Sequence, residues 1–282
     1  MHGKKQFCNL SLNIISCAAT AALVITVVAA LTIILIPSAQ AQSPAISAAR
    51  GEKVLHDFSQ AGGEGTFPLD RLIFDAAGNL YGTTLAGGIP GIDGGTVFEL
   101  MPAAGGHWTE QVLHEFGNGS DGYAPFAGLI FDAAGNLYGT TSTGGTYFHG
   151  AVFELTPNRS GGWTETVQYS FQGYPTDGDG PMAGLIFDAA GNLYGTTYFG
   201  GTYGPGTAFE LTPTQGGGWT ETVLHNFGNG TDGVWPDAGL IFDPAGNLHG
   251  TTENGGTYNY YGTVFELTPI YPCAVCSQAV LQ

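Results

Sequence analysis

Basic residues are scarce in this chain. Lysine and arginine together number 6 of 282 residues, whereas aspartate and glutamate number 23. A surface with so little positive charge repels a phosphate backbone, so we expect no nucleic-acid partner. Cations and neutral polymers are the partners that this charge balance favours.

Cysteine is almost as rare, with four residues in the chain. Cys8 and Cys17 lie in the apolar N-terminal stretch, and Cys273 and Cys276 form a CxxC pair near the C-terminus. Zinc in a structural site needs four ligands, and no second pair exists here. In an exported chain the spacing therefore favours a local disulfide between Cys273 and Cys276.

Helical periodicity is missing after the N-terminal stretch, which indicates an all-β protein. Glycine is abundant, at 47 residues, but it follows no Gly-X-Y period, which excludes collagen. Because 43% of the chain is hydrophobic, simple disorder is also excluded.

The N-terminal stretch has the features of a secretory signal. An apolar run at 14–36 follows Lys4 and Lys5 and precedes the small residues at 38–41. This order predicts a signal peptide over 1–41, cleaved before Gln42, and hence a secreted, cell-surface or periplasmic protein with no membrane insertion after cleavage. The run is longer than an ordinary signal core, so an uncleaved N-terminal membrane anchor is the alternative.

Four near-identical copies of LIFDAAGNLYGTT dominate the rest of the chain. They occupy 72–84, 129–141, 185–197 and 240–252, the last as LIFDPAGNLHGTT. Successive copies start 57, 56 and 55 residues apart. A fixed period of this length is the signature of a repeat architecture.

Each copy codes for four short strands. In the second copy, 128–132 and 137–141 form a predicted hairpin around Gly135, whose place in the turn calls for a positive φ. Predicted strands at 151–157 and 163–171 follow, bounded by proline and glycine. We call the four strands of each repeat a, b, c and d.

Two recurrent features suggest how the repeats pack. A glycine recurs in the middle of strand b, which indicates that a neighbouring backbone or aromatic ring approaches closely there. Strand d begins with tryptophan in three copies, and strand c carries a phenylalanine in all four, which suggests packing between repeats. The residues are Gly82, Gly139, Gly195 and Gly250; Trp108, Trp163 and Trp219; Phe98, Phe153, Phe209 and Phe265.

Tandem four-stranded units favour a four-bladed β-propeller. The last repeat ends after VFEL at 264–267 without its own strand d, whereas VLHDF, within residues 53–58, precedes the first strand a. We therefore expect residues 53–58 to supply the missing outer strand and close the ring, which removes exposed edges. The predicted organisation is a linker at 42–52, a propeller at 53–269 and a CxxC tail at 270–282. An open stack, or a ring made by two chains, is the alternative.

The repeat GLIFDAAGNLYGTT, GG, GTVFELTP, WTETVLHxF resembles the GloVer tandem repeat, a choice-of-anchor type found in exported bacterial proteins. Its D-x-x-G-N-L-Y part also resembles the blades of NHL-type propellers. The resemblance covers 53–269 and implies export and a propeller-like array, with no biochemical activity attached to it.

Where the copies differ, aromatic residues gather in the long loops from strand d to strand a and from strand b to strand c. Loops on a rigid scaffold commonly carry binding sites, and aromatic faces beside Asn and Asp suit neutral sugars or a protein partner. The alternative is that the rings only pack their own loops. The predicted ligand-binding residues are Tyr123, Phe126, Tyr147, Phe148, His149, Tyr198, Phe199, Tyr203, Trp235, Asp237, Tyr258, Tyr260 and Tyr261.

An aspartate ends strand a in every copy, at Asp75, Asp132, Asp188 and Asp243. Aspartate at the start of a tight loop accepts hydrogen bonds from its own turn, which is the favoured interpretation. A ring of four carboxylates around the axis, binding Ca²⁺, is the alternative and the one cofactor that the sequence suggests.

Other recurrent polar residues favour structural roles. His56, His114 and His225 share one position of strand d, where equivalent residues of different repeats lie too far apart to form a metal cluster, so packing between repeats is expected. The strand c glutamates Glu99, Glu154, Glu210 and Glu266 are expected to bond locally.

No catalytic spacing occurs in the chain. The sequence thus favours a non-catalytic module that binds an extracellular glycan or protein. A propeller enzyme of lyase or lactonase type, with an acidic, metal-assisted site near the axis, is the alternative, and a purely architectural envelope protein is a third.

Overall fold

A computed structural model describes residues 51–59, 63–258 and 261–269. The predicted signal peptide, Tyr260 and the pair Cys273 and Cys276 lie outside these ranges. No helix within the described residues is long and apolar enough to cross a membrane.

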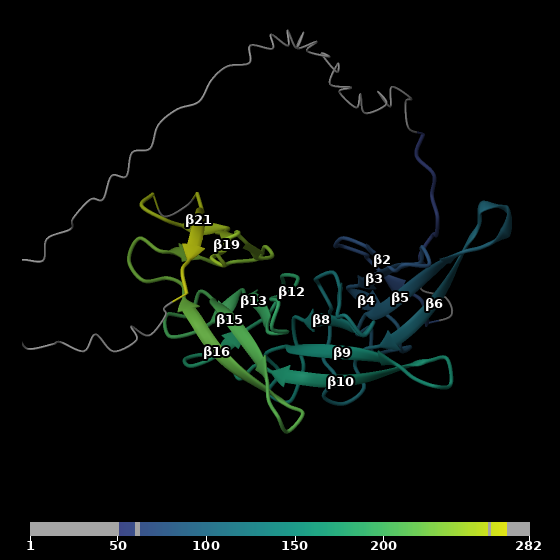
Figure 1. The fold of residues 1–282 in the computed structure, drawn as a ribbon, viewed down its shortest axis with the longest axis horizontal. Helices are drawn as coiled ribbons and strands as arrows, with labels where there is room; N and C mark the ends of the chain where they lie inside the picture. The colour runs from purple at the N-terminus through teal and green to yellow at the C-terminus, as the bar shows by residue number, and fades with distance from the viewer. Residues whose placement is uncertain (1–50, 60–62, 259–260, 270–282) are drawn as a thin grey trace, which may run out of the picture. The chain divides into compact units, whose positions relative to one another are not determined.

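The described chain is all-β, and each repeat forms its own antiparallel sheet (Figure 1). Three sheets have the four predicted strands, and the sheet of the fourth repeat has three. The first sheet contains β2 (Ile73–Phe74), β3 (Leu80–Thr84), β5 (Thr96–Pro102) and β6 (Trp108–Glu115); the second β7 (Ile130–Phe131), β8 (Leu137–Thr141), β9 (Ala151–Pro157) and β10 (Trp163–Ser170); the third β12 (Ile186–Phe187), β13 (Leu193–Thr197), β15 (Thr207–Pro213) and β16 (Trp219–Asn226); the fourth β18 (Ile241–Phe242), β19 (Leu248–Thr252) and β21 (Thr263–Leu267).

Within each sheet the strands are hydrogen-bonded in chain order, as the sequence predicts for a meander. A register shift interrupts the pairing of strands c and d in the three complete sheets, for example between Val167 and Tyr169. Because of this shift, the outer strand d is bulged near its middle, which increases its local twist. A 3₁₀ turn, η2 (Ala104–Gly106), joins β5 to β6 in the first sheet.

The turn between strands a and b is set by its aspartate. Asp132 Oδ1 accepts hydrogen bonds from the backbone N–H groups of Ala134, at 2.9 Å, and Asn136, at 2.8 Å. Gly135 has a φ of 89°, which confirms the positive φ predicted for this turn.

The glycine of strand b leaves room for an aromatic ring. Gly139 and Phe153 are cross-strand partners, and a Cβ atom on Gly139 would lie 2.5 Å from Phe153 Cζ. The same relationship recurs at Gly82, Gly195 and Gly250. The predicted close approach of an aromatic ring is thus confirmed, and it buries the ring against the backbone of its own sheet.

Consecutive sheets share hydrophobic cores across what we call seams. One cluster joins Tyr81 and Phe116 of the first repeat to Phe153 of the second. Phe116, just after β6, lies edge-on to Phe153 with ring centroids 5.0 Å apart, and Tyr81 lies 6.3 Å from Trp163. The phenylalanine after each strand d is therefore buried by the following repeat, which confirms the predicted packing between repeats.

Two-residue ribbons tie the long loops together at one end of three sheets. The ribbons pair β1 (Gly65–Thr66) with β4 (Ala86–Gly87), β11 (Gly178–Asp179) with β14 (Phe199–Gly200), and β17 (Gly233–Val234) with β20 (Asn254–Gly255). In the second repeat a single bridge between Tyr123 and Thr143 takes the same place. The loop before strand a and the loop after strand b thus lie together in every repeat.

Residues 53–58 contact the first sheet without forming a strand. Leu55 and Phe58 pack against the cluster of Leu80, Phe98 and Leu100, and the Phe58 and Phe98 rings lie 4.9 Å apart. In the described ranges β21 pairs with β19 alone, and Val264 of β21 is 82% exposed. The predicted pairing of 53–58 with 264–267 is therefore not observed.

Candidate functional site

The predicted binding residues divide into two groups, and the first packs within the paired loops. The Tyr198 and Trp235 rings, from consecutive repeats, stack 6.1 Å apart at an interplanar angle of 12°. Tyr198 also donates a hydrogen bond to Glu253, which raises the pKa of the tyrosine to about 12. These side chains hold neighbouring loops together.

Other predicted residues also make contacts inside the loops. The Tyr123 hydroxyl donates to the Gly117 carbonyl at 3.3 Å. His149 Nδ1 lies 3.0 Å from Asp179 Oδ2, so an imidazole and a carboxylate pair between loops. Tyr123 thus packs its own loop, whereas Tyr198, Trp235 and His149 join loops of consecutive repeats.

The second group projects into solvent. Phe148 and Tyr258 are each 78% exposed, and Tyr261 is 85% exposed. Asp237 is also exposed. Smaller exposed fractions are found at Phe126, Tyr147, Phe199 and Tyr203. Exposure of these apolar rings to water is unfavourable, and grouped exposure of this kind is typical of surfaces that bind a ligand.

Some of the loop backbone is strained. Phe148 has a φ of 69° and Trp235 a φ of 60°, in the left-handed region that bulky residues avoid. Phe67, which like Trp235 precedes a proline, also has a φ of 60°. Gly180 occupies the corresponding position of the third repeat, with a φ of 66°. Aromatic residues therefore occupy positions where the backbone favours glycine.

A polar cavity of about 620 Å³ opens beside one of these loops. Tyr203, His225 and Asp232 line it, together with Asn226 and Asn229. His225 Nε2 lies 2.7 Å from Asp232 Oδ2, so its main ionisable groups already bond to each other. The cavity offers amide and aromatic groups to a ligand.

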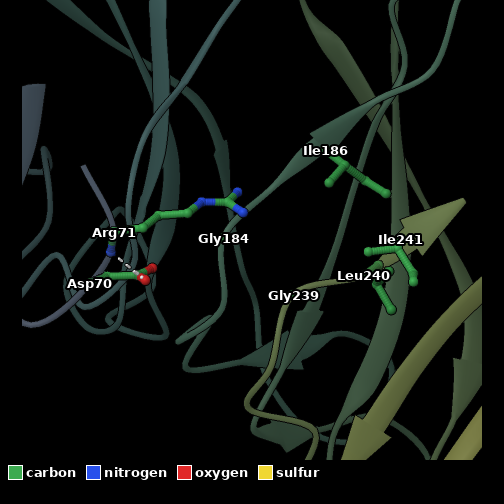
Figure 2. Close-up of a pocket in the computed structure, with 7 residues that line it drawn as sticks. All are labelled: Asp70, Arg71, Gly184, Ile186, Gly239, Leu240 and Ile241. Carbon is green, nitrogen blue, oxygen red and sulfur yellow. Dashed lines mark hydrogen bonds between the residues drawn. The ribbon is translucent and has the colours of Figure 1, made fainter. Parts of the chain in front are cut away.

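A smaller pocket of about 190 Å³ is lined by residues of the first, third and fourth repeats. Figure 2 shows the Arg71 side chain extended toward Gly184, with Ile186, Leu240 and Ile241 beyond it. Asp70 does not project into the pocket as a free acid, because its Oδ1 accepts from the Arg71 backbone and its Oδ2 from the backbone N–H of Gly128. The pocket thus presents one guanidinium among apolar side chains.

The four predicted calcium-ligating aspartates are each engaged in their own turn. Both oxygens of Asp132 accept hydrogen bonds within the turn, and Asp75, Asp188 and Asp243 repeat the pattern. Hydrogen bonds, the Asn247 backbone N–H first among them, hold the pKa of Asp243 at about 2. The structure does not gather these four carboxylates: within the described ranges, three ligand atoms of His, Cys, Asp or Glu meet within 4.8 Å only at His56, Glu64 and Glu110.

The strand c glutamates bond locally, as predicted. Tyr81 donates to Glu99 at 2.8 Å, and Tyr194 donates to Glu210 at 2.9 Å. Burial, followed by the hydrogen bond to the glutamate, raises the pKa of each tyrosine well above its usual value. These pairs stabilise the sheets and offer no acid or base to a substrate.

A comparison with known families identifies the repeat family to which the chain belongs. The Gloeobacter/Verrucomicrobia repeat matches residues 45–186 and again 159–271, which together span most of the chain. The chain belongs to the Gloeobacter/Verrucomicrobia repeat family. A search of curated proteins finds no match to it.

The first three Gloeobacter/Verrucomicrobia repeats each contribute a buried carboxyl group that sequence reasoning missed. Glu110, Glu165 and Glu221 follow the tryptophan of strand d by two residues, and one oxygen of each is buried without a hydrogen-bond partner. Burial raises the pKa of Glu165 to about 7 and that of Glu221 to about 8. The signal was present in the recurrent WTE triplet, but alternation alone does not say that its glutamate faces a seam.

Opposite Glu165 and Glu221 lies a pair formed by strand d of the preceding repeat and the turn that follows it. His114 Nε2 lies 3.1 Å from Asp121 Oδ2, and Tyr169 donates to Asp177 at 2.9 Å. Each of these aspartates precedes a glycine, in a DG dipeptide that recurs at Asp232. The three-residue arrangement therefore repeats at the seams, with Tyr169 replacing histidine in one.

Proposed function

We propose that the protein is an exported binding module without catalytic activity, which binds a neutral glycan through the exposed aromatic rings of its paired loops. The observation that carries the proposal is the high exposure of Phe148, Tyr258 and Tyr261. An aromatic face stacks on the C–H face of a sugar, and adjacent polar groups bond its hydroxyls.

The surroundings of the rings suit a neutral ligand. Asp237 and Asn254 lie in the same class of loops, and the chain carries a net charge of −17, which disfavours an anionic polymer. The left-handed backbone at Phe148 costs about 1–3 kcal/mol, which the rest of the fold must offset. Strain retained at an exposed ring supports a role in binding rather than in folding.

A glycan array tests this proposal. We expect the protein to retain a neutral oligosaccharide, and the double variant Phe148→Ala, Tyr258→Ala to weaken its affinity at least tenfold. Thr220→Ala, a change at an exposed side chain on strand β16 away from the loops, is the control and should bind as the unaltered protein does. Failure to retain any carbohydrate, or equal loss in the control, would contradict the proposal.

The enzyme alternative draws less support from the geometry. It requires at least three carboxylate or histidine groups converging in an open pocket, whereas the pocket in Figure 2 has Asp70 and Arg71 as its charged residues. The cluster of His56, Glu64 and Glu110 lines neither this pocket nor the polar cavity. Glu210, His225 and Glu266 line a third groove, but their ligand atoms do not meet within 4.8 Å of one another. If the array retains no carbohydrate, a protein becomes the candidate partner of the aromatic loops.

We further propose that the four sheets are the blades of a four-bladed β-propeller, closed by residues 52–58. Glu52, His56 and Phe58 have the spacing of Glu221, His225 and Phe227 in strand d of the third repeat. Phe58 packs on Phe98 as Phe227 packs on Phe265, at 4.9 Å in both cases. This likeness supports the proposal that residues 53–58, together with Glu52, take the place of a strand d before the first repeat.

The two ends of the array are complementary. A groove of about 560 Å³, lined by Tyr194, Glu266 and Leu267 among others, lies beside β21, where the fourth strand d is missing. Phe74 is 66% exposed, whereas its equivalents pack on a tyrosine of the preceding repeat, as Phe131 packs on Tyr81. Closure would fill the groove and bring Phe74 to His249, which stands in the place of that tyrosine.

The proposed register pairs Lys53 with Glu266, by analogy with the observed pairing of Thr222 with Glu210. In a background with Cys273→Ser and Cys276→Ser, the variant Lys53→Cys, Glu266→Cys should form a disulfide within one chain. The pair Lys53→Cys, Glu154→Cys is the control and should stay reduced. A disulfide-linked dimer would indicate a ring made by two chains, and no cross-link would contradict closure.

A further inference from the structure

The contact between residues 52–59 and the first sheet is equivalent to a seam, and we call it the first seam. It differs from the other seams at the acidic residue of the turn. The position held by Asp121, Asp177 and Asp232 in later repeats is Glu64 in the first. The longer Glu64 side chain turns back to Ser59, whose backbone N–H and hydroxyl donate to Glu64 Oε2 at 3.1 and 2.8 Å. It therefore makes no hydrogen bond to His56 comparable to the one between His114 and Asp121.

As a result, His56 Nε2 lacks the partner that His114 has in Asp121, and it lies beside Glu110, whose Oε1 is unpaired as in Glu165 and Glu221. His56 Nε2 and Glu110 Oε1 are both buried and accept or donate no hydrogen bond, and the Glu110 side chain is only 7% exposed. A buried polar atom without a partner costs about 1–3 kcal/mol. Two such atoms side by side are unusual, and they point toward a ligand that satisfies both.

The spacing and the donor chemistry suit a metal ion. One ligand atom from each of His56, Glu64 and Glu110 lies within 4.8 Å of the others, and His56 Nε2 is 3.5 Å from Glu110 Oε2. Two ligands at about 2.0–2.1 Å from a tetrahedral zinc ion lie about 3.4 Å apart. One imidazole nitrogen with two carboxylates is a donor set for zinc-like transition metals, whereas Ca²⁺ prefers oxygen ligands throughout.

We propose that His56, Glu64 and Glu110 form a binding site for a divalent transition metal of the Zn²⁺ type. The ion joins the N-terminal segment to β6 of the first sheet and leaves its fourth position to water. The site fixes residues 52–59 at the place where the ring is proposed to close, but it is made by the first seam alone and does not depend on closure.

Isothermal titration with ZnCl₂ tests the site, on untagged protein in a background with Cys273→Ser and Cys276→Ser so that thiols cannot bind the metal. We expect one Zn²⁺ per chain and a higher melting temperature with Zn²⁺, and no comparable effect of CaCl₂. His56→Ala and Glu110→Gln should each raise the Kd at least tenfold.

The repeats supply matched controls. Glu221→Gln removes the same carboxylate from a seam that has Tyr169 in place of the histidine, and His114→Ala removes an imidazole that already pairs with Asp121. Both should retain full stoichiometry. Metal-free melting of each variant shows whether it folds. Zinc binding that survives both site substitutions in folded protein, falls equally in the controls, or is matched by calcium would overturn the proposal.

Discussion

The Phe153 ring lies over Gly139, its cross-strand partner, in the space that a side chain at residue 139 would fill. We expect Gly139→Ala to destabilise the protein by about 1–3 kcal/mol, because the added Cβ overlaps a fully buried ring. Urea unfolding measures the change. Gly216→Ala is the matched control, since nothing lies within 4 Å of a Cβ there, and its stability should change by less than about 0.5 kcal/mol.

Asp132→Ala should cost about 1–3 kcal/mol, because it leaves the backbone N–H groups of Ala134 and Asn136 without their acceptor. We expect the same loss in millimolar calcium and in a chelator, measured by thermal melting. A loss that appears only when calcium is present would instead support the predicted ring of calcium-ligating aspartates.

Stability should depend on pH through the buried glutamates of the seams. Burial and the nearby Asp177 carboxylate raise the pKa of Glu221 to about 8, above the usual 4.5 of the unfolded chain. The folded state then holds the proton more tightly than the unfolded state. The contribution of protonated Glu221 to the free energy of unfolding is therefore fully present below pH 4.5 and is lost as the pH rises through 8.

Glu221→Gln removes this dependence. We expect the free energy of unfolding of the variant, relative to that of the unaltered protein, to rise by about 1–3 kcal/mol as the pH is raised from 5 to 9. Urea unfolding at each pH measures this difference. Asp57→Asn, at an exposed carboxylate, serves as the control. A constant difference at all pH values would show that Glu221 ionises equally in the folded and unfolded states.

Phe67→Gly should be more stable than Phe67→Ala by about 1 kcal/mol, because alanine keeps a Cβ at a φ of 60° and glycine does not. Phe67 is 63% exposed, so both variants lose little packing. Equal stability of the two variants, measured by chemical denaturation, would mean that the loop relaxes out of the left-handed conformation.

Much of the fold followed from the repeat itself. The period, the turn residues and the glycine of strand b predicted four antiparallel strands per repeat and the aromatic ring over Gly139, because these depend on local conformation. The three-stranded fourth sheet of the described residues also agrees with a count of the strands along the chain up to residue 269.

The candidate site was harder to predict because it depends on contacts between repeats. The sequence showed which loops are aromatic, but it could not say that Tyr198 stacks on Trp235 while Phe148 projects into solvent. Glu110 and Glu64 are 46 residues apart, and each looks like an ordinary residue of a strand or turn. Only the seam brings them to His56.

The burial of each strand d phenylalanine by the following repeat has an evolutionary consequence. Every seam is made from the end of one repeat and the middle of the next, so an in-frame duplication of one period, starting at any residue, regenerates a complete seam. Gene duplication can thus lengthen such a chain without changing the contacts at its seams. Glu64 and Arg71, which depart from the repeat pattern, both lie in the first repeat.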